Sequence, residues 1–401
     1  MKYSYRMNNR RSLKRLAERM RLMRTSRGLA LFGIGLMLGA TVFLLRQTLI
    51  ELRGSASGLG ASLVVQTEPL KPITPIEERD KVIGSGAAGQ AASPEPLEPR
   101  QAGGAAATGE DPPEYALGDV VVRVYLTEEK KVEAVPIEAY VQGVVAAEMP
   151  INFELEALKA QAIAARTYIV RRLELGDRSG MPSSGADVTD TIQHQAYLSL
   201  KELESKWTGK AKTDNLAKLK RAVEDTRGLV ITYEGEPIQA AFFSTSNGFT
   251  ENSEDYWQQE LPYLRSVSSP WDEELSPRYE ETVRLSLKDF YKKLDLTGKS
   301  AKGMPDMKVI EVTDGKRIGL MKINGQSFTG RELRERLSLA SSQFTWKVSG
   351  SKIAITTYGY GHGVGMSQWG ANGMAMEGAA AEEILRHYYS GTSITQASKL
   401  P

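Results

Sequence analysis

Glu148 is the side chain whose position best suits acid–base chemistry. Three valines precede it by three, four and seven residues, so in a helix the glutamate shares their apolar face. A proline two positions later predicts that the helix ends here, where the negative end of the helix dipole opposes a further negative charge. Burial and the dipole both raise the pKa of a carboxyl group, and a carboxyl that keeps its proton near neutral pH can act as a general acid. The same spacing also fits a glutamate turned to solvent or paired with Lys159 or Arg166.

A second candidate is the run from Tyr358 to Ala371, in which glycines at 359, 361, 363 and 365 alternate with larger residues. Glycine at every second position gives up conformational entropy and packing, so an ordinary strand would not use it. The pattern predicts the close approach of a ligand or of another backbone. His362 stands between two glycines with no bulky neighbour to bury it, which favours a ligand-facing side chain.

Other residues suit alternative chemistries. Three histidines, His194, His362 and His387, could serve a zinc hydrolase, although their spacing matches no known zinc motif. The chain has no cysteine, which excludes disulfides and thiolate metal sites. Ser246 lies in a polar stretch after an expected strand, where it could form a plain turn or the hydrogen-bonding wall of a sugar site.

The elements that must position these residues indicate a mixed α+β domain, because strands and long helices occur without regular βαβ alternation. A β-branched run predicts the first strand, and Pro136 suits the first turn of the helix that ends at Glu148. The next helix is rich in alanine, which lets another element pack close. The expected elements are a strand over 120–126, helices over 137–148 and 153–175, a strand pair over 228–233 and 239–244, short mixed elements over 282–350, and helices over 366–377 and 380–389.

The N-terminal segment predicts a membrane anchor. Residues 1–27 carry ten Lys or Arg and one acid, and eighteen uncharged residues follow before Arg46. A helix of that length spans about 27 Å, close to the ~30 Å hydrocarbon core, and the basic side should stay cytoplasmic. We therefore expect a cytoplasmic tail over 1–27 and a single transmembrane helix over 28–46, with the rest of the chain outside. A cleaved signal peptide is the alternative.

Composition and charge divide the rest of the chain. A stretch rich in Gly, Ala, Ser, Glu and Pro over 47–115 predicts a flexible linker, followed by a folded ectodomain over 116–395 and a short tail over 396–401. The whole chain has a formal net charge of +2, of which residues 1–27 supply +9, so residues 28–401 carry −7. An acidic ectodomain argues against nucleic acid as its ligand.

Three sequence blocks closely resemble the SpoIID/LytB domain family. They are Glu148–Pro150, Glu156–Tyr168 and Gly361–Ala371, they occur in the order of the family, and the resemblance spans roughly residues 117–395. It implies a peptidoglycan lytic transglycosylase, which cleaves the bond between N-acetylmuramic acid and N-acetylglucosamine, leaves a 1,6-anhydro end and needs no cofactor. Its substrate would be glycan strands whose stem peptides a partner amidase has removed. Glu148 falls on the family's catalytic glutamate.

The resemblance also implies further site residues and partners. Candidates for orienting the sugar, taken from motif position, are Gln161, Arg166, Tyr168, Ser246, His362, Ser367 and Gln368. The setting would be forespore engulfment, at the mother-cell membrane, in a complex with the sporulation proteins P, an amidase, and M. Some relatives bind zinc through a His and two Cys in the region that matches 187–197, but this chain has no cysteine there, so no metal is expected. A non-catalytic, glycan-binding activator of a cell-wall amidase is the alternative function.

Overall fold

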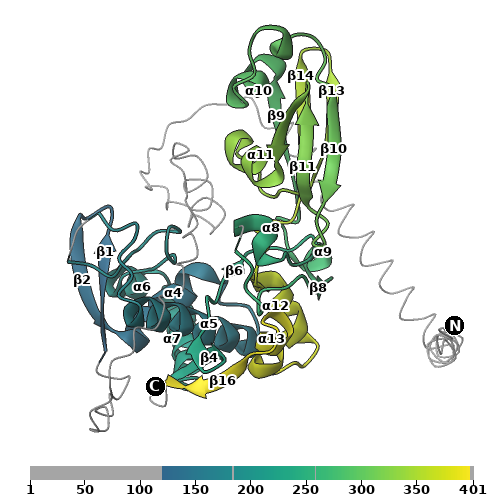
Figure 1. Ribbon diagram of the computed structural model, residues 1–401. Coiled ribbons are helices and arrows are strands. Elements are labelled where there is room, and N and C mark those ends of the chain that lie inside the picture. The colour runs from purple at the N-terminus through teal and green to yellow at the C-terminus, as the bar shows by residue number, and fades with distance from the viewer. Residues whose placement is uncertain (1–119, 183–184, 258, 398–401) are drawn as a thin grey trace, which may run out of the picture. The chain divides into compact units, whose positions relative to one another are not determined.

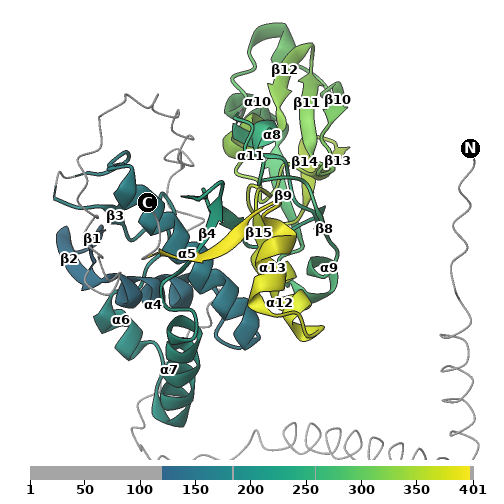
Figure 2. The same ribbon diagram turned by 60° about the horizontal axis from the view of Figure 1, so that its bottom comes forward.

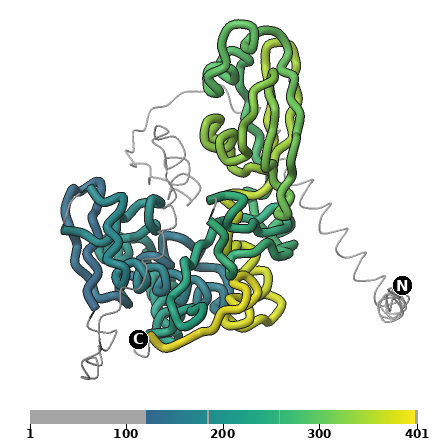
Figure 3. The backbone as a smooth tube through the Cα atoms, in the orientation of Figure 1, coloured from purple at the N-terminus to yellow at the C-terminus, as the bar shows by residue number. Residues whose placement is uncertain are grey.

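The computed structural model describes residues 120–182, 185–257 and 259–397. The predicted basic tail, transmembrane helix and linker, over 1–27, 28–46 and 47–115, lie outside these residues. Within the described ranges no helix is both long enough and apolar enough to span a bilayer. Residues 280–358 form a smaller lobe with a hydrophobic core of its own, and the other described residues form a larger lobe (Figures 1 and 3).

The larger lobe opens with a three-stranded sheet and two long helices. β1 (Val121–Leu126) pairs antiparallel with β2 (Lys131–Pro136) and parallel with β3 (Val188–Thr189). Pro136 then precedes α4 (Ile137–Glu148), as the sequence predicts. The alanine-rich helix is α5 (Leu155–Glu174), whose buried alanines let it pack beside α4. Two further helices, α6 (Leu200–Ser205) and α7 (Gly209–Glu224), follow in the chain (Figure 2).

The strand pair expected over 228–233 and 239–244 is wrong in its second half. β4 (Leu229–Tyr233) pairs with β5 (Glu236–Pro237) and with β16 (Ser393–Gln396), both antiparallel. The reason is a two-residue turn: Glu234 and Gly235 both have positive φ (53° and 89°), so the chain returns at once and pairs Tyr233 with Glu236. The later segment forms β6 (Phe242–Phe243), which pairs parallel with β15 (Met366–Ser367) instead.

The remaining elements of the larger lobe surround this β6–β15 pair. They are β7 (Gly248–Phe249) and β8 (Ser268–Ser269), which pair antiparallel, and the helices α8 (Ser253–Trp257), α9 (Asp272–Leu275), α12 (Gln368–Met376) and α13 (Ala381–Tyr388). The two helices expected after the glycine run are thus confirmed, with slightly shorter bounds. Buried residues of α4, α5, β1, β4 and α13 share one apolar core.

The smaller lobe contains two three-stranded sheets and short helices, in agreement with the short strand-like and helix-like segments expected over 282–350. One has the order β13-β14-β9, and the other has the order β10-β11-β12. The strands are β9 (Glu280–Ser286), β10 (Met307–Val312), β11 (Ile318–Ile323), β12 (Gln326–Thr329), β13 (Phe344–Ser349) and β14 (Lys352–Tyr358). The helices are α10 (Leu287–Lys293), the short 3-10 helix η2 (Gly298–Ala301) and α11 (Gly330–Leu337). The architecture is therefore mixed α+β, as predicted.

Candidate active site

Glu148 is the last residue of α4 and is half-buried. Both of its carboxyl oxygens accept hydrogen bonds. The Ala196 N–H donates to Oε1 over 2.8 Å, and Gln368 Nε2 donates to Oε2 over 3.2 Å. These donors lie 48 and 220 residues further along the chain, so two distant segments converge on one carboxyl group.

The loop that supplies Ala196 is fastened to α4 by aromatic and polar contacts. Tyr197 stacks on Tyr140 of α4, with ring centroids 5.4 Å apart. Tyr140 Oη donates to Gln195 Oε1 over 3.0 Å. Both neighbours of Ala196 are therefore held against the helix that carries Glu148, which fixes the N–H that reaches the carboxyl group.

Gly143 on α4 makes this close approach possible. A Cβ at this position would lie 2.4 Å from Tyr197 Cε2 and 2.6 Å from the Leu198 carbonyl oxygen. Gly143→Ala is therefore expected to push the loop off α4 and to lower the free energy of unfolding by about 1–3 kcal/mol. In an ordinary helix the same change raises stability by about 0.5–1 kcal/mol, so a gain measured by urea unfolding would contradict the contact.

Gln368 is the first residue of α12 and is almost fully buried. Ser367 caps this helix, because its Oγ accepts a hydrogen bond from the Gly370 N–H over 3.3 Å. On the other side of Gln368, the Trp369 N–H donates to the Ser244 carbonyl over 3.1 Å. The backbone is thus held on both sides of the side chain that reaches Glu148.

Two predicted residues, Ser246 and Ser367, meet at Asp272, which the sequence analysis missed. The Ser246 N–H donates to Asp272 Oδ1 over 2.7 Å, and Ser367 Oγ donates to the same oxygen. Burial raises the pKa of Asp272 above its ordinary value, while the hydrogen bonds it accepts oppose the rise. Both serines are fully buried and hydrogen-bonded within the protein, and direct contact of either with a sugar stays a prediction. The sequence around Asp272 does not mark it, because Ser246 and Ser367 lie 26 and 95 residues away along the chain.

Arg166 is fully buried and pairs with Glu138, and a role in sugar binding stays a prediction for this residue. Its Nε and Nη2 donate to the two carboxyl oxygens of Glu138, over 2.9 and 2.6 Å. Its Nη1 donates to the Leu229 carbonyl over 3.2 Å. Glu138 lies in the first turn of α4, so Arg166 steadies the helix at the end opposite Glu148.

The other α5 residues that the sequence singled out have different surroundings. Lys159 pairs with Glu156 and Asp225, at 3.0 and 2.9 Å. Gln161 is fully buried, and neither atom of its amide group has a hydrogen-bond partner within the described residues. Tyr168 is half-buried, and burial raises its pKa to about 12. A role in sugar binding for Gln161 and Tyr168 stays a prediction.

His362 has bulky neighbours, contrary to the expectation from its flanking glycines. The rings of Phe243, Tyr256 and Trp257 surround it, with centroids 5.7, 5.8 and 5.4 Å from its own. These aromatic residues come from segments more than a hundred residues earlier, so the flanking sequence could not reveal them. The Val364 N–H donates to His362 Nδ1 over 3.0 Å, which leaves the proton of the neutral ring on Nε2. The ring is half-buried, and direct contact with a sugar stays a prediction.

The environment of His362 predicts a pH-dependent stability. Burial, helped by the nearby Arg334 and Arg317, lowers the pKa of His362 to about 3, from an ordinary value of 6.5. Between pH 6.5 and about pH 3, His362 binds a proton in the unfolded chain but not in the folded chain. The contribution of the neutral His362 to the free energy of unfolding is therefore complete above pH 6.5 and is lost as the pH falls through this range.

We expect the free energy of unfolding to fall by about 1–2 kcal/mol more in the wild type than in His362→Asn between pH 7 and pH 5. Urea unfolding at both pH values measures the difference. Parallel losses in the two proteins would contradict a neutral His362 in the folded protein.

The glycine run approaches protein atoms of its own chain. A Cβ at Gly365 would lie 2.0 Å from the Ala241 carbonyl oxygen, and one at Gly363 would lie 2.6 Å from Arg317 Nε. Both glycines also have positive φ, of 81° and 88°. Of the two causes that the sequence left open, close packing of another part of the chain therefore accounts for these positions.

The three histidines lie in separate environments. His194 Nδ1 is 2.8 Å from Thr189 Oγ1, and His387 Nε2 is 2.8 Å from the Ser268 carbonyl oxygen. His362 lies in the aromatic surround described above. Across the part of the chain that the structure describes, no three His, Cys, Asp or Glu side chains are grouped to hold a metal ion.

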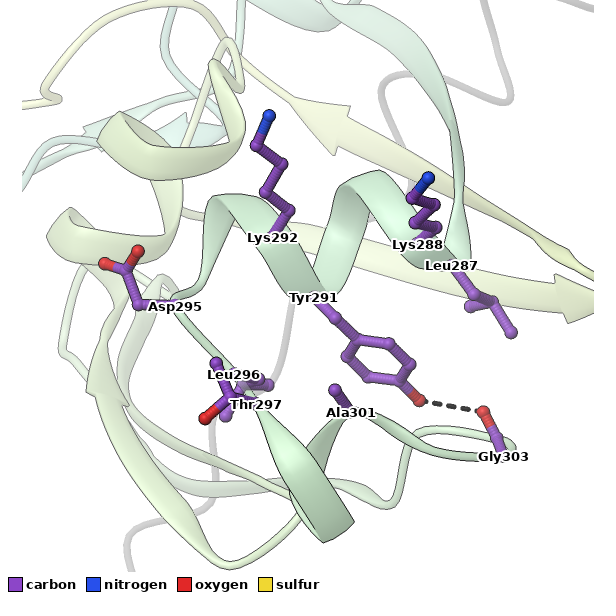
Figure 4. A pocket seen from close by; sticks show the side chains of 9 residues that line it. All are labelled: Leu287, Lys288, Tyr291, Lys292, Asp295, Leu296, Thr297, Ala301 and Gly303. Atoms are coloured by element: carbon purple, nitrogen blue, oxygen red, sulfur yellow. Dashed lines mark hydrogen bonds between the residues drawn. The ribbon is translucent and has the colours of Figure 1, made fainter.

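A cavity of about 700 Å³ lies in the smaller lobe beside α10 (Figure 4). Tyr291 forms part of its wall and donates from Oη to the Gly303 carbonyl over 2.9 Å. Lys288 and Lys292 extend from the same side of the helix. No predicted site residue lines this cavity, so it is a feature separate from the surroundings of Glu148.

Comparison with known proteins finds a consistent set of relatives. Residues 125–233 match the family model described as stage II sporulation protein. The chain is 48% identical over 280 residues to stage II sporulation protein D of Bacillus amyloliquefaciens, covering 69% of this chain and 79% of the relative. It is 47% identical over 280 residues to the protein of the same name in Bacillus subtilis (strain 168), covering 69% and 80%. It is also 31% identical over 305 residues to the amidase enhancer of Bacillus subtilis, covering 63% of this chain and 40% of that protein.

Proposed function

This chain belongs to the SpoIID family of stage II sporulation proteins, and from that premise we propose that it is a lytic transglycosylase acting on peptidoglycan. The observation that carries the proposal is the Glu148 carboxyl group, half-buried at a helix end and held at both oxygens by amide donors. A single carboxyl fixed in this way is the group that an internal glycan cleavage requires.

The proton that starts the proposed reaction belongs on Glu148 Oε2. Both oxygens accept a hydrogen bond, but the Ala196 N–H bond to Oε1, at 2.8 Å, is shorter than the Gln368 bond to Oε2, at 3.2 Å. Oε1 therefore suits the carbonyl oxygen of the acid form, and the hydroxyl falls on Oε2. This hydroxyl protonates the glycosidic oxygen, the bond from that oxygen to C1 breaks, and positive charge develops on the N-acetylmuramic acid ring.

The N-acetylmuramic acid residue then closes on itself. Its C6 hydroxyl attacks C1 and forms the 1,6-anhydro bond, and the proton of that hydroxyl returns to the Glu148 carboxylate. Because the attacking hydroxyl is internal, no second carboxylate is needed to activate water, unlike in the paired-acid hydrolases. Glu148 ends the reaction protonated, as it began.

Gln368 is proposed to stabilise the carboxylate that exists between these two steps. Its Nε2 donates to Oε2, the oxygen that loses the proton, over 3.2 Å. A hydrogen bond to an ionised acceptor is about twice as strong as one to a neutral acceptor, so this bond strengthens as the reaction proceeds. Such an interaction accelerates the chemical step.

The cellular setting is part of the proposal. The substrate would be glycan strands stripped of their stem peptides, and the event would be forespore engulfment. The predicted N-terminal helix would hold the protein in the mother-cell membrane, where it would work with the sporulation proteins P and M. The ectodomain would face the cell wall.

A second candidate function is supported by the relative named amidase enhancer. In that case this chain would bind glycan and activate a cell-wall amidase without cutting the strand. The products formed from glycan strands distinguish the two functions.

The test incubates the full-length protein with peptide-free glycan strands and examines both the pellet and the soluble products. New anhydro-terminated fragments, identified by mass spectrometry, would support the transglycosylase. Sedimentation of the protein with glycan, without any new ends, would contradict it and favour the amidase activator.

A further inference from the structure

Asp272 begins α9 and is fully buried although it is a carboxylate. A buried charge without partners is strongly unfavourable, and this carboxylate accepts hydrogen bonds at both oxygens. The donors are the Ser246 N–H and Ser367 Oγ at Oδ1, and Ser269 Oγ at Oδ2 over 2.8 Å. Tyr388 Oη lies 2.8 Å from Ser269 Oγ and extends the group to α13. The proposed reaction uses none of these residues directly.

Ser367 connects this buried group to the start of α12. Its hydroxyl donates to Asp272 and accepts the Gly370 N–H over 3.3 Å, so one oxygen joins the carboxylate to the first turn of the helix. The turn is packed tightly on the same group. A Cβ at Gly370 would lie 2.1 Å from Tyr388 Oη and 2.3 Å from Ser269 Oγ.

The side chain that benefits from this anchoring is Gln368, the first residue of the same turn. Its hydrogen bond to Glu148 measures 3.2 Å, at the long end of the normal range, so a small displacement of α12 would break it. The backbone pairing between β6 and β15 next to it is only two residues long. The hydrogen bond from Ser367 to Asp272 is a further anchor of this turn, beside the Trp369 N–H bond to the Ser244 carbonyl.

We propose that Asp272 is a positioning residue for Glu148: it holds the Ser367 hydroxyl, which fixes the first turn of α12 and thereby the Gln368 amide that contacts the glutamate. Asp272 does not contact the reacting atoms. The inference rests on the proposed function wherever turnover is the quantity measured.

The test compares two serines that donate to the same buried carboxylate. Ser367→Ala removes the donor that is itself hydrogen-bonded to the first turn of α12, and Ser269→Ala removes a donor that packs against this turn without a hydrogen bond to it. Both hydroxyls are buried, so we expect both changes to lower Tm by a similar amount, about 2–4 °C. Turnover of peptide-free glycan, measured below both Tm values, should fall about tenfold in Ser367→Ala and less than about twofold in Ser269→Ala.

A double-mutant cycle separates positioning from general damage. In a Gln368→Ala background, Ser367→Ala should cause no further loss of turnover, because the group it positions is gone. Equal losses in the two serine variants, or a Ser367→Ala loss that persists in full in the Gln368→Ala background, would overturn the proposal.

A second measurement does not depend on turnover. The titration midpoint of the Glu148 side-chain carbon, followed by carbon-13 NMR of the full-length protein, should rise by about half to one pH unit when the donor to Oε2 is lost. Ser367→Ala and Gln368→Ala should show the same rise, and Ser269→Ala should show none. An unchanged midpoint in Ser367→Ala beside a shifted one in Gln368→Ala would overturn the positioning role. A wild-type protein without turnover would instead contradict the proposed function and leave this titration to decide.

Discussion

Glu148→Gln is expected to lower the release of anhydro-terminated product by about three orders of magnitude. The amide keeps the size of the side chain but has no acidic proton to give to the glycosidic oxygen, and general acid catalysis typically contributes about 10²- to 10⁴-fold. The fold should survive, because the Ala196 N–H can still donate to the amide oxygen at the position of Oε1, and the Gln368 amide can turn so that its oxygen accepts from the new NH2 group. Product release from peptide-free glycan, quantified by mass spectrometry, measures the effect.

Glu174→Gln is the matched control for this change. Glu174 is also the last residue of a long helix, but its side chain is exposed and makes no contact with the surroundings of Glu148 described above. Its loss should leave product release unchanged. Near-normal release by a folded Glu148→Gln protein would remove the general acid from the mechanism.

Gln368→Met is expected to have the second-largest effect, a fall in kcat of about 100-fold. Methionine has nearly the length and volume of glutamine but cannot donate a hydrogen bond to Oε2, and removing one donor to a charge that develops in the transition state costs about 10²- to 10³-fold. We take the lower end of that range because the bond is long, at 3.2 Å. Steady-state kinetics on glycan strands of defined length give kcat and KM separately.

The division between kcat and KM decides the role of Gln368. A bond that strengthens only as Glu148 loses its proton should change kcat and leave KM close to its original value. If the loss appears in KM alone, Gln368 binds the substrate and does not act on the glutamate. A Tm close to that of the wild type would exclude unfolding as the cause.

The sequence predicts an element correctly where the residues that determine it lie within or beside that element. The proline before α4, the valine spacing within it and the proline that follows Glu148 predict both ends of this helix correctly. The alanines of α5 predict a long helix in close contact with another element. The prediction failed for the partner of the strand over 228–233, which was expected over 239–244. Glu234 and Gly235 close a tighter turn than the spacing suggested, and the partner of β6 lies more than a hundred residues away.

The candidate site could be predicted only in part, for the same physical reason. The helical face and helix end of Glu148 are local features, so its position could be inferred directly. Its contact with Gln368 joins residues 220 positions apart, and only the family resemblance placed both in one site. His362 was misjudged because its aromatic neighbours are distant in sequence, and Asp272 was missed because two of its three donors, Ser246 and Ser367, come from other segments.

The most direct test of the proposed chemistry is to cleave peptide-free glycan strands in oxygen-18-labelled water and to weigh the new ends. Attack by the C6 hydroxyl of the sugar itself involves no water, so we expect 1,6-anhydro ends that carry no solvent oxygen and are lighter than hydrolysed ends by one water molecule. New reducing ends that contain the label would show that water is the nucleophile, and they would contradict the one-carboxyl mechanism built on Glu148.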